Sequence, residues 1–475
     1  MEQDTSSNAL AVEAKPAPLV ARLFDVGQHR RAELLDIGRS LRSGTPRLSL
    51  GTWHRPDDRP TPLATLEGQA ADRVPYLLPL RYGRMLASPF AFYRGNAAIM
   101  AWDLARSPSS GINVQACGDA HLMNFGVYGD VSGNLIFDIN DFDETLPAPF
   151  EWDVKRLAAS FVVATRDIGL SDKVGRRAAQ ATAEQYRLTT HEMLGMTSLD
   201  IAREHFSIAA MLGLANNRER RLLLHTQADA LRRTNQSAVA KLSQVVDGRL
   251  ELVNNPPLVV VRPDEETAAV NKALSFYQST LPHNVRHLLS EYTLRSIARK
   301  VVGVGSVGLR TFILLFEGKG PEDGLLLQAK QAPASVMQPY AGASEYVSNG
   351  ERVVAGQRIM QALSDPFLGW LRLGEWDFYF RQFRHLKTSV ELQATHAFFE
   401  NYARLCGATL AHAHARSVDP ALIAGYLGKQ DNFDRALADF ATAYADQTER
   451  DYKALKKAAA NGDIVVEEAA ATNDG

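Results

Sequence analysis

The sequence has few cysteines, no excess of one charge and no long hydrophobic run. Cys117 and Cys406 are the only cysteines among 475 residues, which argues against a disulfide scaffold and fits a reducing compartment. The formal net charge of -2 gives no sign of a broad cationic surface for nucleic acid. No apolar stretch approaches the roughly 20 residues that span a bilayer, and no signal peptide is visible. We therefore expect a cytoplasmic protein without a nucleic-acid or membrane partner.

The composition that remains is ordinary for a globular protein, with 45% hydrophobic and 22% charged residues. Helical and strand-like periodicities alternate, and they predict an α+β fold with helices at about 283–299 and 344–363. The predicted organisation is a partly irregular N-terminal arm (1–75), a helical lobe (76–300), a β-rich lobe (301–390), helices that complete the helical lobe (391–457) and a disordered tail (458–475).

The segment GDAHLMNFGVYGDVSGNLIFDINDFDE, residues 118–144, concentrates carboxylates around one amide. Asp119 and Asn124 are five positions apart, and a predicted β-hairpin then leads to Asp138 and Asp141. In phosphoryl transfer, one aspartate orients the attacking hydroxyl while an amide and a second aspartate hold Mg²⁺ against the phosphates. The segment therefore indicates phosphoryl transfer, with Asp119 as the catalytic base.

The first part of this segment resembles the G-D-x-H-x-x-N loop of the aminoglycoside phosphotransferase-like small-molecule kinases. In that superfamily a metal-binding aspartate follows on a strand, and a buried aspartate opens the next helix. Asp141 and Asp153, twelve positions apart, fit those places. The resemblance implies Asn124 and Asp141 as Mg²⁺ ligands, with Asp138 as the competing candidate, and it implies that His121 and Asp153 support the loop. Over most of its length the chain also resembles a bacterial family, domain of unknown function twenty-two fifty-two, which implies no activity.

A second constellation combines a glycine-rich turn with a lysine. Gly303, Gly305 and Gly308 form G-x-G-x-x-G around Ser306, and two apolar runs follow, the second of which ends at Lys330. A Rossmann motif requires a helix at this point, whereas this sequence continues with the β-like run TFILLF. Glycines let backbone N–H groups approach phosphates, and a lysine on a neighbouring strand can pair with them. The pattern is similar to the ATP-binding hairpin of kinases, and a plain β-hairpin with a solvated lysine is the alternative.

In kinases the helix after this lysine supplies a glutamate partner. Glu345 and Glu351 are the two candidates for Lys330, and the stronger helical periodicity around Glu351 favours it. The segment SPFAFYRGN, residues 88–96, combines aromatic side chains with Arg94. It either lines a substrate or phosphate site or packs in the core with one solvent-facing arginine.

The two constellations occur in the reverse of the usual kinase order, because Asp119 precedes Gly303. The implied fold is a protein kinase-like two-lobed fold that is circularly permuted, with a small β-rich nucleotide lobe after the catalytic loop. The implied function is transfer of the γ-phosphate of ATP, with Mg²⁺, to a hydroxyl of an unidentified small-molecule acceptor. An ATP-binding pseudokinase or regulatory protein and AMP transfer from the same site are the alternatives. A metal-dependent phosphoesterase requires longer segments after His121 than the sequence has.

Overall fold

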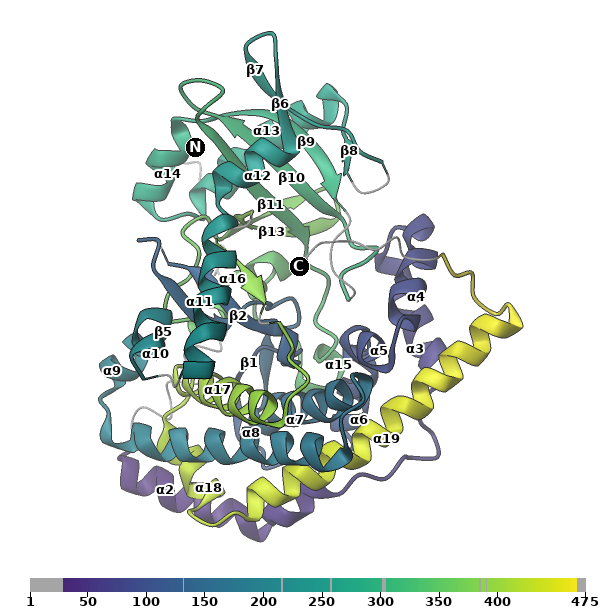
Figure 1. Ribbon diagram of the computed structural model, residues 1–475, viewed down its shortest axis with the longest axis vertical. Coiled ribbons are helices and arrows are strands. Elements are labelled where there is room, and N and C mark those ends of the chain that lie inside the picture. The colour runs from purple at the N-terminus through teal and green to yellow at the C-terminus, as the bar shows by residue number, and fades with distance from the viewer. Residues whose placement is uncertain are drawn as a thin grey trace, which may run out of the picture.

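The computed structural model describes residues 29–467 except 131, 215–216, 257–258, 301–304, 384–385 and 390. The fold is mixed α+β, with a strand-rich part at the top of Figure 1 and a helical part below it. None of the helices in these described ranges combines the length and the apolar character needed to cross a membrane.

A six-stranded antiparallel sheet forms the strand-rich part, with the strand order β12-β13-β11-β10-β9-β8. Its strands are β8 Val259–Val261, β9 Thr293–Lys300, β10 Thr311–Glu317, β11 Gly324–Gln331, β12 Gly369–Leu373 and β13 Trp376–Gln382. The central strands β10 and β11 are buried at nearly every position, because the sheet is covered on both faces. Residues that pair directly across an antiparallel ladder share a face, so Lys330 lies on the same face as its partner Thr311.

Different elements cover the two faces of this sheet. Helices α13 Asp264–Ser279 and α14 His283–Ser290 pack their apolar side chains on one face, around Tyr277 and Leu314. Helix α12 Asn235–Leu242 and the hairpin of β6 Ser243–Val246 and β7 Arg249–Leu252 pack on the other face, around Ile313 and Leu326. The ladder places Lys330 on this second face, at the end of β11.

The sheet begins earlier in the chain than residue 301, where the β-rich lobe was predicted to start. Strand β9 occupies residues that were predicted to be helical, since α14 ends at Ser290 and the chain pairs from Thr293 onward. Hydrogen bonds to β10 on one side and β8 on the other decide the conformation of this run, whatever its local periodicity. The helix predicted at 344–363 is shorter: α16 spans Asn349–Met360, and the hydroxyl of Ser348 caps its first turn.

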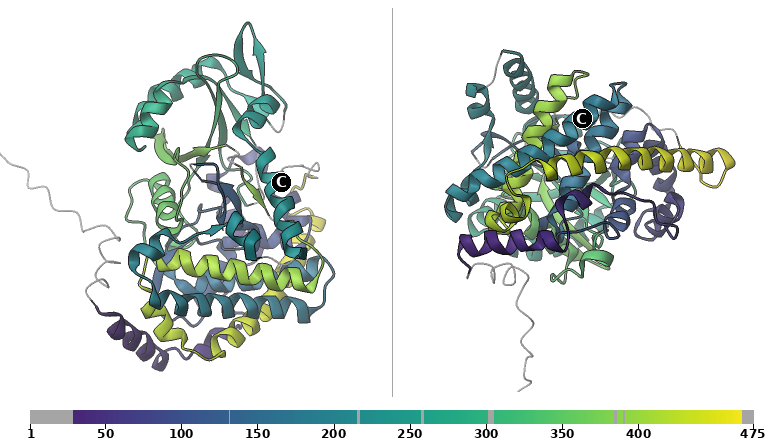
Figure 2. Two further views of the ribbon diagram at one scale, coloured as in Figure 1. Left: turned by 60° about the vertical axis from the view of Figure 1, so that its left-hand side comes forward. Right: turned by 90° about the horizontal axis from the view of Figure 1, so that it is seen from below.

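The helical part is built on α7 Phe150–Asp167, α8 Asp172–Glu192, α17 His396–Ala415, α18 Pro420–Leu427 and α19 Asn432–Asn461, which Figure 2 shows packed together. Helix α7 is buried along almost its whole length, because the other helices surround it. Helix α19 runs past residue 458, so the first part of the predicted tail is helical as far as Asn461, and residues 468–475 lie outside the described ranges.

The described part of the predicted N-terminal arm is mainly helical. It contains α2 Arg31–Ser40, the 3₁₀ turns Leu41–Ser43, Arg47–Gly51 and Ala70–Asp72, and α3 Pro62–Gly68. After the 3₁₀ turn Pro75–Leu77 come α4 Leu78–Leu86, α5 Pro89–Gly95 and α6 Ala97–Leu104. Helix α2 crosses α18 so closely that a Cβ at Gly38 would collide with the carbonyl oxygen of Leu422. Residues 1–28 lie outside the described ranges.

Short strands lie between the sheet and the helices. The hairpin of β2 Phe125–Gly129 and β3 Leu135–Ile139 is extended by β14 Thr388–Ser389 and β5 Phe206–Ser207, while β1 Asn113–Ala116 pairs with β4 Leu146–Pro149. The remaining helices are α9 Ser198–Arg203, α10 Ile208–Leu214, α11 Asn217–Arg232 and α15 Gln338–Ala341, with 3₁₀ turns at Leu122–Asn124 and Met193–Gly195. The loops after β1 and β3 carry the predicted site residues toward one another.

Candidate active site

A cavity of about 210 Å³ is lined by residues from four separate parts of the chain, one of which is the segment 333–336 after β11. The 118–144 segment contributes the acidic side, with Asp119, Asn124 and Asp141 among its residues. The turn between β9 and β10 contributes Gly305 and Ser306, and the N-terminal helices contribute a third side. Gly303 lies outside the described residues.

The loop that carries Asp119 is fixed by its own glycine and by Asp153. Gly118 adopts a φ of +81°, and a Cβ there would collide with the carbonyl oxygen of Glu144, so only glycine fits. Asp153, in the first turn of α7, accepts N–H bonds from Cys117 at 2.7 Å and Gly118 at 3.0 Å. These are the backbone contacts expected of Asp153, and they set the direction in which the next residue, Asp119, points.

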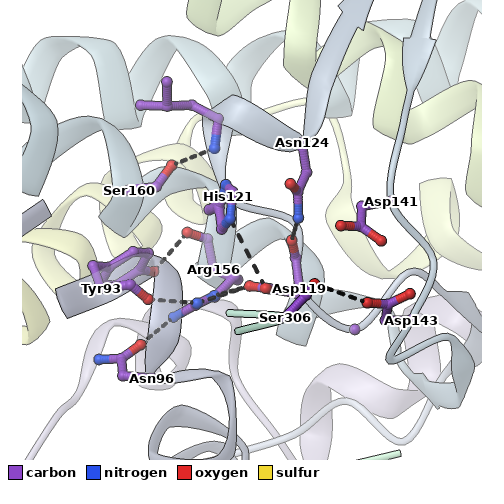
Figure 3. A network of polar contacts seen from close by, with 12 residues as sticks. Tyr93, Asn96, Asp119, His121, Asn124, Asp141, Asp143, Arg156, Ser160 and Ser306 are labelled. Atoms are coloured by element: carbon purple, nitrogen blue, oxygen red, sulfur yellow. Dashed lines mark hydrogen bonds and ion pairs between the residues drawn. The ribbon is translucent and has the colours of Figure 1, made fainter. Parts of the chain in front are cut away.

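Asp119 is held by a buried arginine that the sequence did not single out. Arg156 contacts one carboxylate oxygen of Asp119, Oδ1, with its Nε at 2.8 Å and its Nη2 at 2.7 Å (Figure 3). The same guanidinium donates to Asn96 Oδ1 and to the Tyr93 carbonyl, which fixes its position. Burial raises the pKa of Asp119, and the charge of Arg156 partly offsets that rise. The other carboxylate oxygen, Oδ2, lies 3.9 Å from the Nε2 of His121.

His121 and Asn124 complete this loop. Asn124 donates its side-chain N–H to the carbonyl of Asp119 at 2.7 Å, which ties the amide to the base candidate. His121 is buried and lines the cavity, and its Nδ1 has no hydrogen-bond partner among the described residues. Burial, assisted by Arg94 and Arg156, lowers the pKa of His121 well below its ordinary value, so its ring is neutral.

The two metal candidates of the hairpin lie in different environments. Asp141 lines the cavity beside Asn124, and its Oδ1 is buried without a hydrogen-bond partner in the described structure. Burial by itself raises the pKa of Asp141, but Lys330 and two further cations reverse that effect and hold it below its ordinary value. Asp138 instead accepts the N–H of Ile139 and interacts with Arg416, and burial raises its pKa to about 6. Asp138 is not part of the cavity lining, so the geometry favours Asp141 of the two.

Lys330, at the end of strand β11, contacts Asp143 and lies close to Asp141. Its Nζ hydrogen bonds to Asp143 Oδ2 and lies 3.9 Å from Asp141 Oδ1, and its side chain is only 3% exposed. Asp143 also accepts a hydrogen bond from the hydroxyl of Tyr379 at 2.7 Å, on the neighbouring strand β13. Burial alone lowers the pKa of Lys330, but the two carboxylates raise it above its ordinary value, so the ammonium stays charged.

The glutamate partner predicted for Lys330 is wrong. Neither Glu351 nor Glu345 pairs with this lysine in the described structure, where its carboxylate partners are Asp143 and Asp141. Helix α16 directs Arg352 toward the site instead of Glu351, and this guanidinium donates to the carbonyl of Asp143. Glu351 and Arg352 are consecutive on α16 and so point in different directions. The helical periodicity of the sequence could not show which of the two faces the site.

The described part of the glycine turn folds over the acidic side of the cavity. Ser306 donates its hydroxyl to Asp143 Oδ2 at 3.4 Å. Gly308 adopts a φ of +92°, a conformation that favours glycine, and packs against the side chain of Arg73. The Nη1 of Arg73 bonds to the carbonyls of Gly305 and Val307, so the turn is attached to the N-terminal helices.

Several residues of the site had no clear signal in the sequence. Arg156 lies three positions after Asp153 on α7, where one helical turn brings it to the same side, and that spacing could have revealed it. His414 approaches Asp153 Oδ2 at 3.2 Å and bonds to Tyr186, so it supports the brace of the loop. Arg94, for which a site and a core position were both open, lines the cavity together with Arg81.

No curated protein matches the chain, and no solved structure matches it either. The site is therefore interpreted from its own residues. A family model matches residues 73–458, a range that starts at Arg73 of the cavity and includes every predicted site residue. The chain belongs to this family, which is described as an uncharacterized protein conserved in bacteria (DUF2252).

Proposed function

We propose that the chain is an ATP-dependent phosphotransferase with a circularly permuted, kinase-like, two-lobed fold. It would move the γ-phosphate of ATP, with Mg²⁺, to a hydroxyl of a small-molecule acceptor. One observation carries the proposal: Lys330 Nζ lies 3.9 Å from Asp141 Oδ1, and Asp141 shares a cavity with Asp119 and Asn124. A phosphate-binding lysine, a metal ligand and a base are the parts that phosphoryl transfer requires in one place.

The permuted order is supported by the way distant segments meet. Lys330 and Asp143 are 187 positions apart in the chain and are directly hydrogen bonded. The lysine belongs to an antiparallel run of β9, β10 and β11, with a glycine-containing turn between the first two strands. The carboxylates Asp141 and Asp143 come from the loop that follows β3 of the earlier hairpin. One site explains both constellations, whereas two unrelated sites would leave their contact without a reason.

The donor set fits Mg²⁺ held partly by a substrate. Mg²⁺ is usually bound by one or two carboxylates together with phosphates and water, and a cage made only of protein groups is not needed. The described residues form no group of three or more His, Cys, Asp and Glu side chains suited to a metal. Asp141 Oδ1, which accepts no hydrogen bond from the described residues, and the side-chain oxygen of Asn124 would hold the ion, which would supply charge neutralisation for the phosphates.

Asp119 is suited to accept the acceptor's proton. Arg156 contacts its Oδ1, which leaves Oδ2 for the hydroxyl. As the acceptor oxygen bonds to the γ-phosphorus, the bond from that phosphorus to the bridging oxygen breaks, the hydroxyl proton passes to Asp119, and ADP leaves. The pKa of Asp119, raised by burial, makes the carboxylate a better proton acceptor than an exposed aspartate. Lys330 carries the positive charge for the donor phosphates.

Labelled ATP tests this proposal. The purified full chain is incubated with Mg²⁺, a small-molecule cell extract and ATP labelled at either the γ- or the α-phosphorus. We expect label from the γ-position alone to appear in a new product, and we expect Asp119→Asn to abolish it. Asp130→Asn, in a carboxylate that stabilises the turn of the same hairpin outside the cavity, should leave transfer intact.

Two results would contradict the proposal. Transfer of the α-label would instead assign AMP transfer to the site. Tight binding of Mg-ATP by the wild-type chain, without any labelled product, would make the protein a nucleotide-binding regulator.

A further inference from the structure

Three arginines form one side of the cavity. Arg73 follows the 3₁₀ turn Ala70–Asp72, Arg81 belongs to α4 and Arg94 belongs to α5, and Figure 1 shows these two helices at the right, close to α3. All three line the same cavity as Asp119 and Asp141. We call this side, Arg73, Arg81 and Arg94, the arginine wall.

Arg81 is a buried cation that has no carboxylate partner among the residues that the structure describes. Its side chain is among the largest that are fully buried, with 1% of the residue exposed. Its Nη2 donates to the neutral amide oxygen of Gln69 at 2.7 Å, whereas its Nε and Nη1 have no partner in the described part of the chain. Burial and the neighbouring Arg73 lower the pKa of Arg81 to about 9, and no carboxylate offsets the effect.

The other two arginines also keep unpaired N–H groups at the cavity. The Nε of Arg94 is buried without a partner among the described residues, and so is the Nε of Arg73. Burial lowers the pKa of both guanidinium groups. Asp119 and Asp141 act on Arg94 through charge, which places this arginine electrostatically close to the proposed reaction centre.

Two other buried arginines of this protein, Arg59 and Arg187, are paired directly with carboxylates. Arg59 bonds to the carboxylates of Asp103 and Asp451, and Arg187 bonds to that of Asp434. A buried charge without such a partner costs several kcal/mol, and adjacent like charges add to that cost. The arginine wall therefore has the charge, the free donors and the water-excluded setting of a site for an anion.

We infer that the arginine wall binds an oxyanion group, a phosphate monoester or a carboxylate, that the acceptor carries. This inference rests on the proposed function, because it uses Asp119 as the base in the same cavity. In the proposed function, the donor phosphates are bound by the metal ligands and by Lys330, which lies beside Asp141, so the arginines that line the same cavity are left for the acceptor. The acceptor class is thus an anionic hydroxyl compound, whose hydroxyl is presented to Asp119 while its oxyanion lies on Arg81.

Calorimetric titration with simple anions tests the inference. The full chain is saturated with Mg²⁺ and a non-hydrolysable ATP analogue and is then titrated with inorganic phosphate or with acetate. We expect at least one of the two anions to bind beside the analogue, and the better one identifies the acceptor's group. Arg81→Met should weaken that binding by about tenfold or more, because charge-assisted bonds are lost. Arg106→Met, at an exposed arginine stacked on Trp102, is the matched control and should leave binding unchanged.

Thermal unfolding gives a second readout that separates binding from folding. Removing an unpaired buried charge should raise the unfolding midpoint of ligand-free Arg81→Met, while the stabilisation by phosphate or acetate is lost. If Arg81→Met does not fold, Arg94→Met replaces it in the titration.

Three results would overturn the inference. The first is binding of neither anion, the second is anion binding that the ATP analogue displaces, and the third is anion binding that both arginine variants retain. If the analogue fails to bind while phosphate or acetate binds and depends on Arg81, the proposed function fails and the anion site remains.

Discussion

The acidic and arginine sides of the cavity differ in how their charges are compensated. On the acidic side Asp119 is bonded to Arg156, and Asp143 is bonded to Lys330, so each of these two carboxylates has a cation in direct contact. On the opposite side, the described structure gives Arg81 no carboxylate at all. In the first arrangement, side chains of the protein itself hold the carboxylates in position. The second leaves N–H groups of Arg73, Arg81 and Arg94 without hydrogen-bond partners among the described residues.

This difference indicates a division of labour. Paired charges keep their geometry whether or not a substrate is present, which suits groups that must be aligned before reaction. Unpaired buried charges are stabilised when an anion binds to them, and this property suits a site for substrate selection. Under the proposed function, the acidic side of the cavity would carry out the chemistry and the arginine wall would recognise the acceptor.

The largest effect is expected where the chemistry is proposed to occur. Asp119→Asn keeps the shape and a hydrogen-bond acceptor for Arg156 but cannot take a proton. We expect turnover with the labelled acceptor to fall by about 10³-fold, while the Kd for Mg-ATP changes little. Rapid-quench measurement of product and calorimetric measurement of nucleotide binding separate the two quantities. Full turnover in this variant would remove Asp119 from its role.

The second effect tests the pairing on the acidic side. Arg156→Met removes the cation from Asp119 and leaves the side-chain oxygen of Asn96 and the carbonyl of Tyr93 without their donor. Breaking a buried pair from one side costs about 3–5 kcal/mol of unfolding free energy. Denaturant titration should show this loss, and the exposed control Arg106→Met should stay within about 0.5 kcal/mol of wild type.

The opposite sign of Arg81→Met makes the pair of variants informative. Both remove a buried guanidinium, but only Arg156 has a carboxylate to leave behind. If both variants lose stability equally, the two sides of the cavity do not differ in the way described.

The contrast also shows why one side could be predicted, whereas on the other side only Arg94 was a candidate, with a core position as its alternative. Asp119, Asn124 and Asp141 lie in one short segment around a hairpin, so local spacing indicates that they meet. The arginines of the opposite side are spread over three helical or turn elements whose apolar neighbours look like ordinary core. Whether Arg81 has a partner depends on tertiary packing, so the local sequence pattern could not predict it.

The fold was predictable to a similar depth. The α+β class and the strands β10 and β11 follow from apolar runs and turn residues. Strand β9 did not follow, because its pairing on both sides outweighs its local pattern. Likewise, the contact of Lys330 with Asp143 depends on how the sheet sits on the hairpin, so it could not be chosen over Glu351 from the sequence.

A third, smaller effect is a pH dependence of stability that comes from Glu144, an acidic residue of the cavity without a cationic partner among the described residues. Glu144 lines the cavity and accepts the N–H of Val336 at 2.7 Å rather than a cationic side chain. Burial raises its pKa from 4.5 to about 7. The folded state therefore binds this proton more tightly than the unfolded state. The contribution of Glu144 to the free energy of unfolding is full below pH 4.5 and decreases as the pH rises to about 7.

The contribution of Glu144 can be isolated by difference. The unfolding free energy of wild type minus that of Glu144→Gln should decrease by at most about 3 kcal/mol over this pH interval and then level off. Urea titrations at several pH values measure it. A difference that stays flat, or that grows with pH, would show that Glu144 is ionised at no cost and belongs with the paired carboxylates.

The smallest effect tests whether the arginine wall is uniform. Arg73 differs from Arg81 because its Nη1 bonds to the carbonyls of Gly305 and Val307 and so holds the glycine turn. Arg73→Met removes these bonds, and we expect a loss of about 1 kcal/mol in unfolding free energy, since a neutral acceptor on a turn can regain water. Because the turn is also proposed to cover the nucleotide phosphates, the Kd for Mg-ATP should rise a few-fold in Arg73→Met and stay unchanged in Arg81→Met. An equal rise in both variants would show that the arginine wall contacts the donor, and the division between the two sides of the cavity would be lost.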